Sequence, residues 1–115
     1  MDPNCIFCKI IAGEIPATVI DRDKDFIAIA DVNPQAPTHL LVMPIKHYPN
    51  LNAFIDVLSN TVIARLFAFA AHLGASAGKG AGYRIVINTG PNGGQSVDHL
   101  HIHVLAGRHM SWPPG

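Results

Sequence analysis

His99-Leu100-His101-Ile102-His103-Val104-Leu105 is the stretch that decides the fold, because histidines and apolar residues alternate strictly along it. Successive side chains of a β-strand point to opposite faces of the sheet, so the alternation predicts a strand from His99 to Ala106. The three histidines would share one face of this strand and the apolar residues the other. Three aligned histidines favour a functional site, although the polar face of an edge strand or a loose metal site would give the same pattern.

A glycine-rich loop, Thr89 to Ser96, runs directly into this strand. Its glycines allow backbone N–H groups to converge on an anion, and Gln95 and Ser96 add side-chain donors. Neutral imidazole is a good nucleophile near physiological pH. Taken alone the loop is typical of an ordinary hairpin, but together with the histidines it favours chemistry at a phosphorus atom.

The rest of the chain predicts an α+β fold, with a five-stranded, mainly antiparallel sheet, one long helix and a short N-terminal helix. From Leu51 onward apolar residues recur every three or four positions, which indicates helix, and Ser59-Asn60-Thr61 supplies capping residues within that region. The expected elements are a helix at 5–12, strands at 18–21, 26–30, 39–43, 83–88 and 99–106, a short helix from 51, and a main helix from about 61 to 73, stopped by Gly74 and Gly78. We expect residues 1–115 to form a single domain.

Composition excludes several classes of protein. The chain has 115 residues, of which 49% are hydrophobic and 14% charged, and its net charge is zero. A disordered chain would be less apolar, and a nucleic-acid binder would be basic. The sequence shows no apolar stretch of about 20 residues, no signal-peptide pattern and only two cysteines. We therefore expect a cytoplasmic protein without nucleic-acid or membrane partners, and the low charge favours an oligomer.

Residues 99–105 match the pattern His-φ-His-φ-His-φ-φ, where φ is apolar, and so resemble the signature of the histidine triad (HIT) family of nucleotide hydrolases and transferases. The similarity continues through 6–11, 31–39, 93–96 and 112–115. Gly93-Gly94-Gln95-Ser96 and the tail Trp112-Pro113-Pro114-Gly115 resemble the Hint branch, the purine nucleoside phosphoramidases. The resemblance implies a HIT-like fold and a homodimer whose sheets join across a two-fold axis.

The resemblance also implies roles for individual residues. His101 would attack the α-phosphorus of a purine nucleoside phosphoramidate or other AMP conjugate, and water would hydrolyse the nucleotidyl-histidine. His103 and Ser96 would assist at the phosphate and the leaving group, His39 would support the nucleophile, and the reaction would need no catalytic metal. The implied nucleotide-binding positions are Asp31 at the ribose, Val32 at the base, and Asn88, Gly94, Gln95, Ser96, His101, His103 and Trp112.

Other functions stay open from the sequence. A dinucleoside polyphosphate hydrolase of the Fhit branch would share the triad, although the loop serine and the tail argue against it. A uridylyl transferase is disfavoured because its triad usually ends in glutamine, where this chain has His103. A nucleotide-binding or partner-binding adaptor with only residual catalysis is the alternative from a different class.

Cys5 and Cys8 form a Cys-x-x-Cys pair, the spacing at which two thiolates can share one tetrahedral ion. A redox pair or two buried helix residues would show the same spacing. In bacterial-type HIT proteins that the chain resembles, residues matching His47 and His99 complete the set. The resemblance thus implies a zinc ion on Cys5, Cys8, His47 and His99, and four protein ligands would make it structural.

Overall fold

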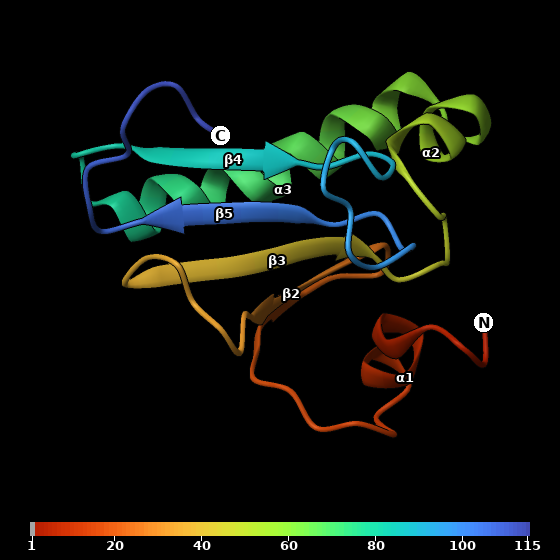
Figure 1. Cartoon of the computed structure of the whole chain (residues 1–115). Coiled ribbons are helices and arrows are strands. Elements are labelled where there is room, and N and C mark those ends of the chain that lie inside the picture. Colours follow the sequence, from red (N-terminus) through yellow and green to blue (C-terminus); the bar gives the residue numbers. More distant parts are fainter. Residues whose placement is uncertain (1) are drawn as a thin grey trace.

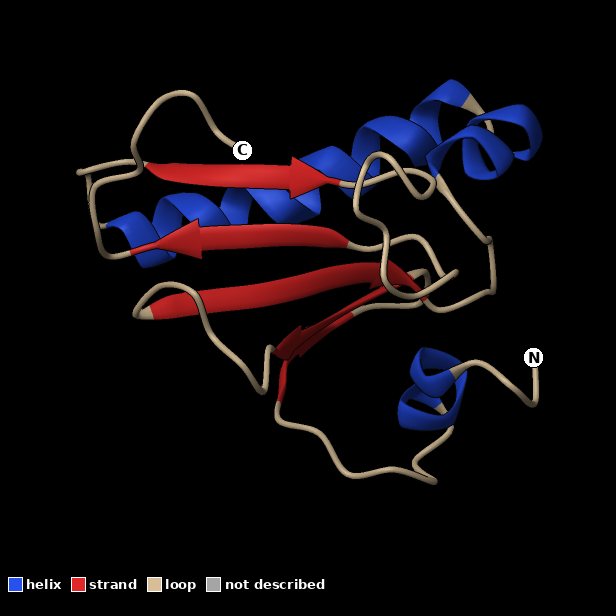
Figure 2. Cartoon of the chain, in the orientation of Figure 1, coloured by secondary structure: helices blue, strands red, loops and turns tan. Residues whose placement is uncertain are grey.

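One antiparallel sheet with helices on both faces makes up the fold of the computed structural model, which describes residues 2–115 (Figures 1 and 2). The elements are α1 (Ile6–Ile11), β1 (Val19–Arg22), β2 (Phe26–Ala30), β3 (Thr38–Pro44), α2 (Leu51–Val57), α3 (Asn60–Gly78), β4 (Tyr83–Ile87) and β5 (Ile102–Ala106). The strand order is β1-β2-β3-β5-β4, and every neighbouring pair is antiparallel. The expected α+β class, five-stranded sheet, long helix and short N-terminal helix are confirmed.

Each face of the sheet buries its own cluster of apolar side chains. Alternate residues of β2, β3 and β5 pack with Phe54 of α2 and with Leu66 and Ala70 of α3. The other face buries Phe7 and Ile11 of α1 against the remaining residues of β2 and β3. Figure 1 shows α3 behind the sheet and α1 at the lower right, near the N-terminus. The triad histidines belong to the α1 face, because Leu100, Ile102 and Val104 all point to the α3 face.

The fifth strand begins later than its alternation predicts, at Ile102 instead of His99. The last paired residues of β3 and β5 are Val42 and Ile102, so the same register would continue with Met43 opposite His101 and then Pro44 opposite Leu100. Proline has no N–H to donate to a ladder. The Leu100 N–H instead donates to the Tyr48 carbonyl over 2.7 Å. His99 and His101 thus precede the strand, while His103 lies within it.

The long helix also differs from its prediction. It runs through Gly74 to Gly78, and Lys79 in the left-handed conformation caps it. Gly74 therefore does not stop the helix. A Cβ at this position would lie 2.3 Å from the ring of Tyr83, so the glycine allows β4 to pack closely on the helix. The predicted start is confirmed, because the Ser59 hydroxyl accepts the N–H of Val62.

By length and composition α3 is the one helix of residues 2–115 that could cross a membrane. Core helices of globular proteins pass the same test. Leu66, Ala70, Gly74 and Gly78 are buried, and α3 packs along β3, β4 and β5. The helix accordingly serves as the cover of one face of the sheet.

Candidate active site and metal centre

Three histidines meet on the α1 face of the sheet, where β3 and β5 lie side by side. β3 contributes His39, and its residue Leu41 pairs with His103 of β5. His101 lies just before β5, and its ring is in edge-on contact with that of His103, with centroids 5.1 Å apart. His39 and His101 are buried and His103 is half-buried. The structure thus brings together three of the four predicted catalytic side chains.

The backbone of His99 fixes the protonation of the His101 ring. Nδ1 of His101 lies 2.7 Å from the His99 carbonyl oxygen. A carbonyl only accepts hydrogen bonds, so Nδ1 carries the proton and Nε2 of the neutral ring keeps its lone pair. This is the form of imidazole that attacks an electrophile, and Nε2 is the atom that would do so.

His39 contacts His103, and not the ring of His101. Nε2 of His39 lies 2.9 Å from Nδ1 of His103 and 3.4 Å from a carboxylate oxygen of Asp31. Burial is the main cause that lowers the pKa of His103 to about 4, and the neighbouring His101 and His39 contribute to this shift. His103 is therefore neutral at physiological pH, and any support that His39 gives to the nucleophile passes through His103.

The second cluster is the one predicted for zinc. Cys5, Cys8 and His99 are buried and His47 is half-buried, and their four ligand atoms lie within 4.8 Å of one another. The sulfur-to-Nδ1 distances are 3.4 Å for Cys5–His99, 3.6 Å for Cys8–His99 and 3.4 Å for Cys8–His47. The two Nδ1 atoms are 3.2 Å apart. The cluster thus joins three segments: α1 with its N-cap contributes Cys5 and Cys8, the segment after β3 contributes His47, and the start of the triad contributes His99.

These distances fit a tetrahedral ion. Typical zinc bonds of about 2.3 Å to sulfur and about 2.0 Å to nitrogen place tetrahedral ligands about 3.5 Å apart for sulfur and nitrogen, and about 3.3 Å apart for two nitrogens. The His99 Nε2–H donates to the Pro44 carbonyl over 2.8 Å, which leaves the lone pair on Nδ1, toward the cluster. Nε2 of His47 faces the Asp2 carboxylate at 3.8 Å. Both histidines therefore have the outer partners typical of metal ligands.

The pKa shifts of His99 and Cys5 also fit a bound metal ion. Burial lowers the pKa of His99 to about 4, so this ring is neutral and can act as a ligand. Burial raises the pKa of the Cys5 thiol, which disfavours a bare thiolate. A cation would offset this cost by binding the deprotonated sulfur. The donor set of two sulfurs and two imidazoles is the kind that zinc prefers.

The glycine-rich loop differs from its prediction at one side chain. The Gln95 amide nitrogen donates to the carbonyls of Pro49 and Val97, at 2.7 and 3.0 Å, and its oxygen accepts the Gly90 N–H. Its side chain therefore braces the loop and is not a free donor for a ligand. Ser96 is exposed, Asn88 is half-buried beyond the end of β4, and Gly94 has a φ of +78°.

The predicted nucleoside-binding residues lie at the surface. Asp31 and Val32 follow β2 and line a pocket of about 390 Å³ with residues 16–18. Val32 is 98% exposed and Trp112 is 82% exposed, so both apolar side chains are free to cover a base. Trp112 lies in the C-terminal tail, whose backbone is held by Arg84 through the carbonyls of Met110 and Ser111.

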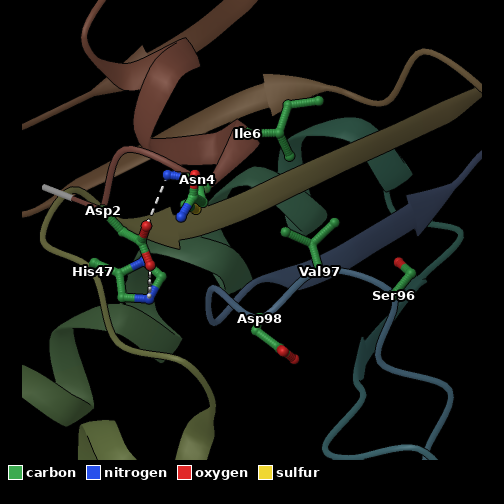
Figure 3. Close-up of a pocket in the computed structure, with 8 residues that line it drawn as sticks. Asp2, Asn4, Ile6, His47, Ser96, Val97 and Asp98 are labelled. Atoms are coloured by element: carbon green, nitrogen blue, oxygen red, sulfur yellow. Dashed lines mark hydrogen bonds and ion pairs between the residues drawn. The ribbon is translucent and has the colours of Figure 1, made fainter.

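A second pocket, of about 400 Å³, connects the metal cluster to the loop. Figure 3 shows His47 and Asp2 at one side of this pocket and Ser96 at the other, with Asp98 between them. Asp98 is exposed to solvent. Two of the predicted metal ligands, Cys5 and His47, thus line the same pocket as the predicted loop serine.

Two contacts of the site were not predicted from the sequence. Phe7 of α1 packs edge-on against both His99 and His101, with ring centroids 5.9 and 5.1 Å away. Its position between the two cysteines was the available signal. The backbone N–H of Gln35 donates to Nδ1 of His39 over 3.0 Å. A backbone contact of this kind leaves no trace in the residue type.

The fold and the site define a small α+β protein with buried histidines on one face of the sheet, a glycine-rich loop before them and a Cys2His2 cluster. The chain belongs to the HIT domain family, whose model matches residues 12–110. It is 44% identical over 115 residues to a 14 kDa zinc-binding protein of Zea mays, covering 99% of this chain and 90% of that protein. It is 47% identical over 118 residues to an uncharacterised HIT-like protein of Synechococcus elongatus, covering both chains completely.

Solved structures agree with this assignment. The crystal structure of a HIT family hydrolase from Legionella pneumophila superposes with a TM-score of 0.88 at 48% identity, covering 97% of this chain and 100% of the other. A histidine triad protein from Clostridium difficile gives a TM-score of 0.84 at 38% identity, with 96% of each chain covered. The chain therefore has the HIT fold, and a HIT family hydrolase is among its structural neighbours.

Proposed function

We propose that this protein hydrolyses purine nucleoside phosphoramidates and related AMP conjugates at the α-phosphorus, through a covalent nucleotidyl-histidine. The observation that carries the proposal is the hydrogen bond from His101 Nδ1 to the His99 carbonyl, because it leaves a lone pair on Nε2. The similarity to a HIT family hydrolase supports hydrolysis as the reaction class.

In the proposed reaction Nε2 of His101 attacks the α-phosphorus. The P–N or P–O bond of the leaving group breaks, and the leaving atom keeps the electron pair and takes up a proton. Ser96, on the loop that precedes the triad, is the proposed donor at this position. Water then attacks the phosphorus and its proton returns to Ser96, while the bond between Nε2 and phosphorus breaks, which releases AMP and restores the lone pair of His101.

The remaining residues bind the nucleotide in this proposal. The neutral His103 ring and the backbone N–H groups of the loop offer hydrogen bonds to the phosphate oxygens. Asp31 would accept hydrogen bonds from the ribose hydroxyls, and Val32 would pack on the base. Asn88 would help to hold the phosphate. The pocket beside Asp31 and Val32 supports this placement of the nucleoside.

We propose zinc as the ion of Cys5, Cys8, His47 and His99, with a structural role. The similarity to a zinc-binding protein of Zea mays and the ligand distances support this proposal. Zinc supplies a cross-link between α1 and the start of the triad when it is bound. All four ligands come from the protein and leave no coordination position open for a substrate, as is typical of a structural zinc site.

We further propose that the protein acts as a cytoplasmic homodimer. The edge strand β4 supports the dimer, since β5 pairs with one side of it and no strand of residues 2–115 pairs with the other. Tyr83 and Ile85 of β4 are exposed apolar side chains at this edge. The tail with Trp112 would reach the partner's site in such a dimer.

The test is AMP release from adenosine 5′-phosphoramidate, with His101→Ala and with EDTA in parallel. We expect turnover that is lost in His101→Ala and retained in EDTA. His72→Ala, which changes an exposed histidine of α3, is the matched control and should keep full turnover. Mass spectrometry of quenched enzyme should find the nucleotidyl adduct on His101. A folded enzyme that binds AMP without turnover would contradict the proposal and favour an adaptor.

A further inference from the structure

Asp31 lies at the end of a chain of hydrogen-bonding groups that leads into the active site. Its Oδ2 is 3.4 Å from Nε2 of His39, and that nitrogen is 2.9 Å from Nδ1 of His103. Asp31 also accepts the Asn33 N–H through Oδ1 at 2.8 Å, so two contacts hold its carboxylate. The side chain is only 17% exposed, and that of His39 is 5% exposed.

The partners of His39 determine which of its nitrogens carries the proton. The Gln35 N–H donates to Nδ1, so Nδ1 must present a lone pair. The proton of the neutral ring is then on Nε2, where the Asp31 carboxylate attracts it. Nε2–H faces Nδ1 of His103, so His103 must accept there and carry its own proton on Nε2.

The same protonation argues against a metal ion at these three residues. Asp31, His39 and His103 offer one carboxylate and two imidazole atoms within 4.8 Å of one another, which is a possible ligand set. A metal on Nε2 of His39 would require this nitrogen to be deprotonated. Because Nδ1 already accepts from Gln35, the ring would have to be an imidazolate, which is costly. The cluster is therefore a polar contact between Asp31 and His39 followed by a hydrogen bond between His39 and His103.

We propose that Asp31 is a positioning residue for the reaction: together with the Gln35 N–H it holds His39 as the Nε2–H tautomer, and through His39 it fixes His103 as an Nε2–H donor toward the phosphate. This inference rests on the proposed function and adds a role to the ribose contact proposed for Asp31. The same carboxylate then has two roles: it binds the ribose hydroxyls, and through His39 it keeps the proton of His103 on Nε2. The low pKa of His103, about 4, agrees with a neutral donor.

Substrates without ribose hydroxyls separate the two roles of Asp31. Asp31→Asn keeps an oxygen for the Asn33 N–H and places an amide N–H₂ or a weaker acceptor near His39. On 2′,3′-dideoxyadenosine 5′-phosphoramidate we expect kcat to fall about 10-fold relative to wild type, with little change in KM. If Asp31 acts only on the ribose, this variant and the wild type will be equal on the dideoxy substrate, and the inference is wrong.

A double-mutant cycle tests the route through His39. His39→Gln offers an amide N–H to His103 but has no tautomers. In that background Asp31→Asn should leave kcat on the dideoxy substrate unchanged, because the two residues act in series. Additive losses would overturn the route. Asp56→Asn, an exposed carboxylate of α2, is the control that should match wild type on both substrates.

Nitrogen NMR of ¹⁵N-histidine-labelled protein tests the inference without substrate. In wild type at pH 7.5, His39 and His103 should both show a protonated Nε2 and an unprotonated Nδ1. In Asp31→Asn both signals should move toward averaged values of a tautomer mixture. Unchanged shifts would contradict the inference. Absence of turnover in wild type would instead contradict the proposed function, and the NMR result would still decide the tautomers.

Discussion

Gly74 is a residue whose substitution reverses the usual expectation for a helix. Gly→Ala in a helix interior normally stabilises by about 0.5–1 kcal/mol. Here the new Cβ would lie 2.3 Å from the Tyr83 ring, so the ring or the strand must move. We expect Gly74→Ala to lower the free energy of unfolding by about 1–3 kcal/mol, as overpacking does. Urea unfolding followed by circular dichroism measures the change.

The cause can be checked with Tyr83→Leu, which removes the ring that the Cβ would meet. Gly74→Ala should be neutral or stabilising in that background, which gives a coupling energy of about 1–3 kcal/mol. The same loss in both backgrounds would show that the ring is not responsible.

His103 should make stability depend on pH. Its pKa is about 4 in the folded chain and about 6.5 when unfolded, so the unfolded state binds more protons between these values. Its contribution is complete above pH 6.5 and is lost as the pH falls toward 4, by about 1–3 kcal/mol. His103→Gln should flatten this part of the profile of unfolding free energy against pH. An unchanged slope would mean that His103 is not the group that titrates.

At the scale of elements, α1 is the helix that we expect the proposed zinc ion to stabilise most. It has six residues, and isolated helices of this length are unstable in water. We expect removal of zinc by a chelator to expose α1 to amide hydrogen exchange, while β2, β3 and β5 stay protected. Cys8→Ser should do the same, with zinc content measured by elemental analysis. Retained protection of residues 6–11 in metal-free protein would contradict this.

The elements show where sequence patterns predict well and where they fail. Alternation found the central strands, because their side chains alternate between two buried clusters. It could not place the start of β5, which depends on Pro44 lacking an N–H in the neighbouring strand. The predicted end of α3 at Gly74 was wrong for a similar reason. This glycine makes room for the ring of Tyr83, nine residues further along, and does not end the helix.

The candidate site divides in the same way. The spacing of Cys5 and Cys8 indicated a metal site, the family resemblance added His47 and His99, and the structure brings those four side chains together. The free lone pair of His101 depends on the His99 carbonyl, and the tautomer of His39 depends on the Gln35 N–H. Backbone groups are the same in every residue except proline, so such contacts follow only from the folded chain. The prediction that the Gln95 side chain is a free donor was wrong for the same reason, since its amide nitrogen donates to two backbone carbonyls.

At the scale of the whole molecule, the two edges of the sheet are unlike each other. β1 carries the charged residues Asp21 and Arg22, and charges on an edge strand oppose pairing with another sheet. β4 has a single charged residue, Arg84, whose guanidinium is occupied by the C-terminal tail. Tyr83 and Ile85 of β4 are exposed apolar side chains. This asymmetry favours β4 as the edge where two copies meet.

The dimer can be tested by one substitution at each edge. Ile85→Lys on β4 and Ile20→Lys on β1 make the same chemical change at side chains that are 36% and 46% exposed. We expect light scattering to give twice 12.3 kDa for wild type and for Ile20→Lys, and 12.3 kDa for Ile85→Lys. A lysine in a self-complementary interface meets its own copy or apolar surface, which disfavours association. The monomer should also lose turnover, because Trp112 would no longer reach the partner's site. A wild-type mass of 12.3 kDa would contradict the dimer, and a dimeric Ile85→Lys would place the interface elsewhere.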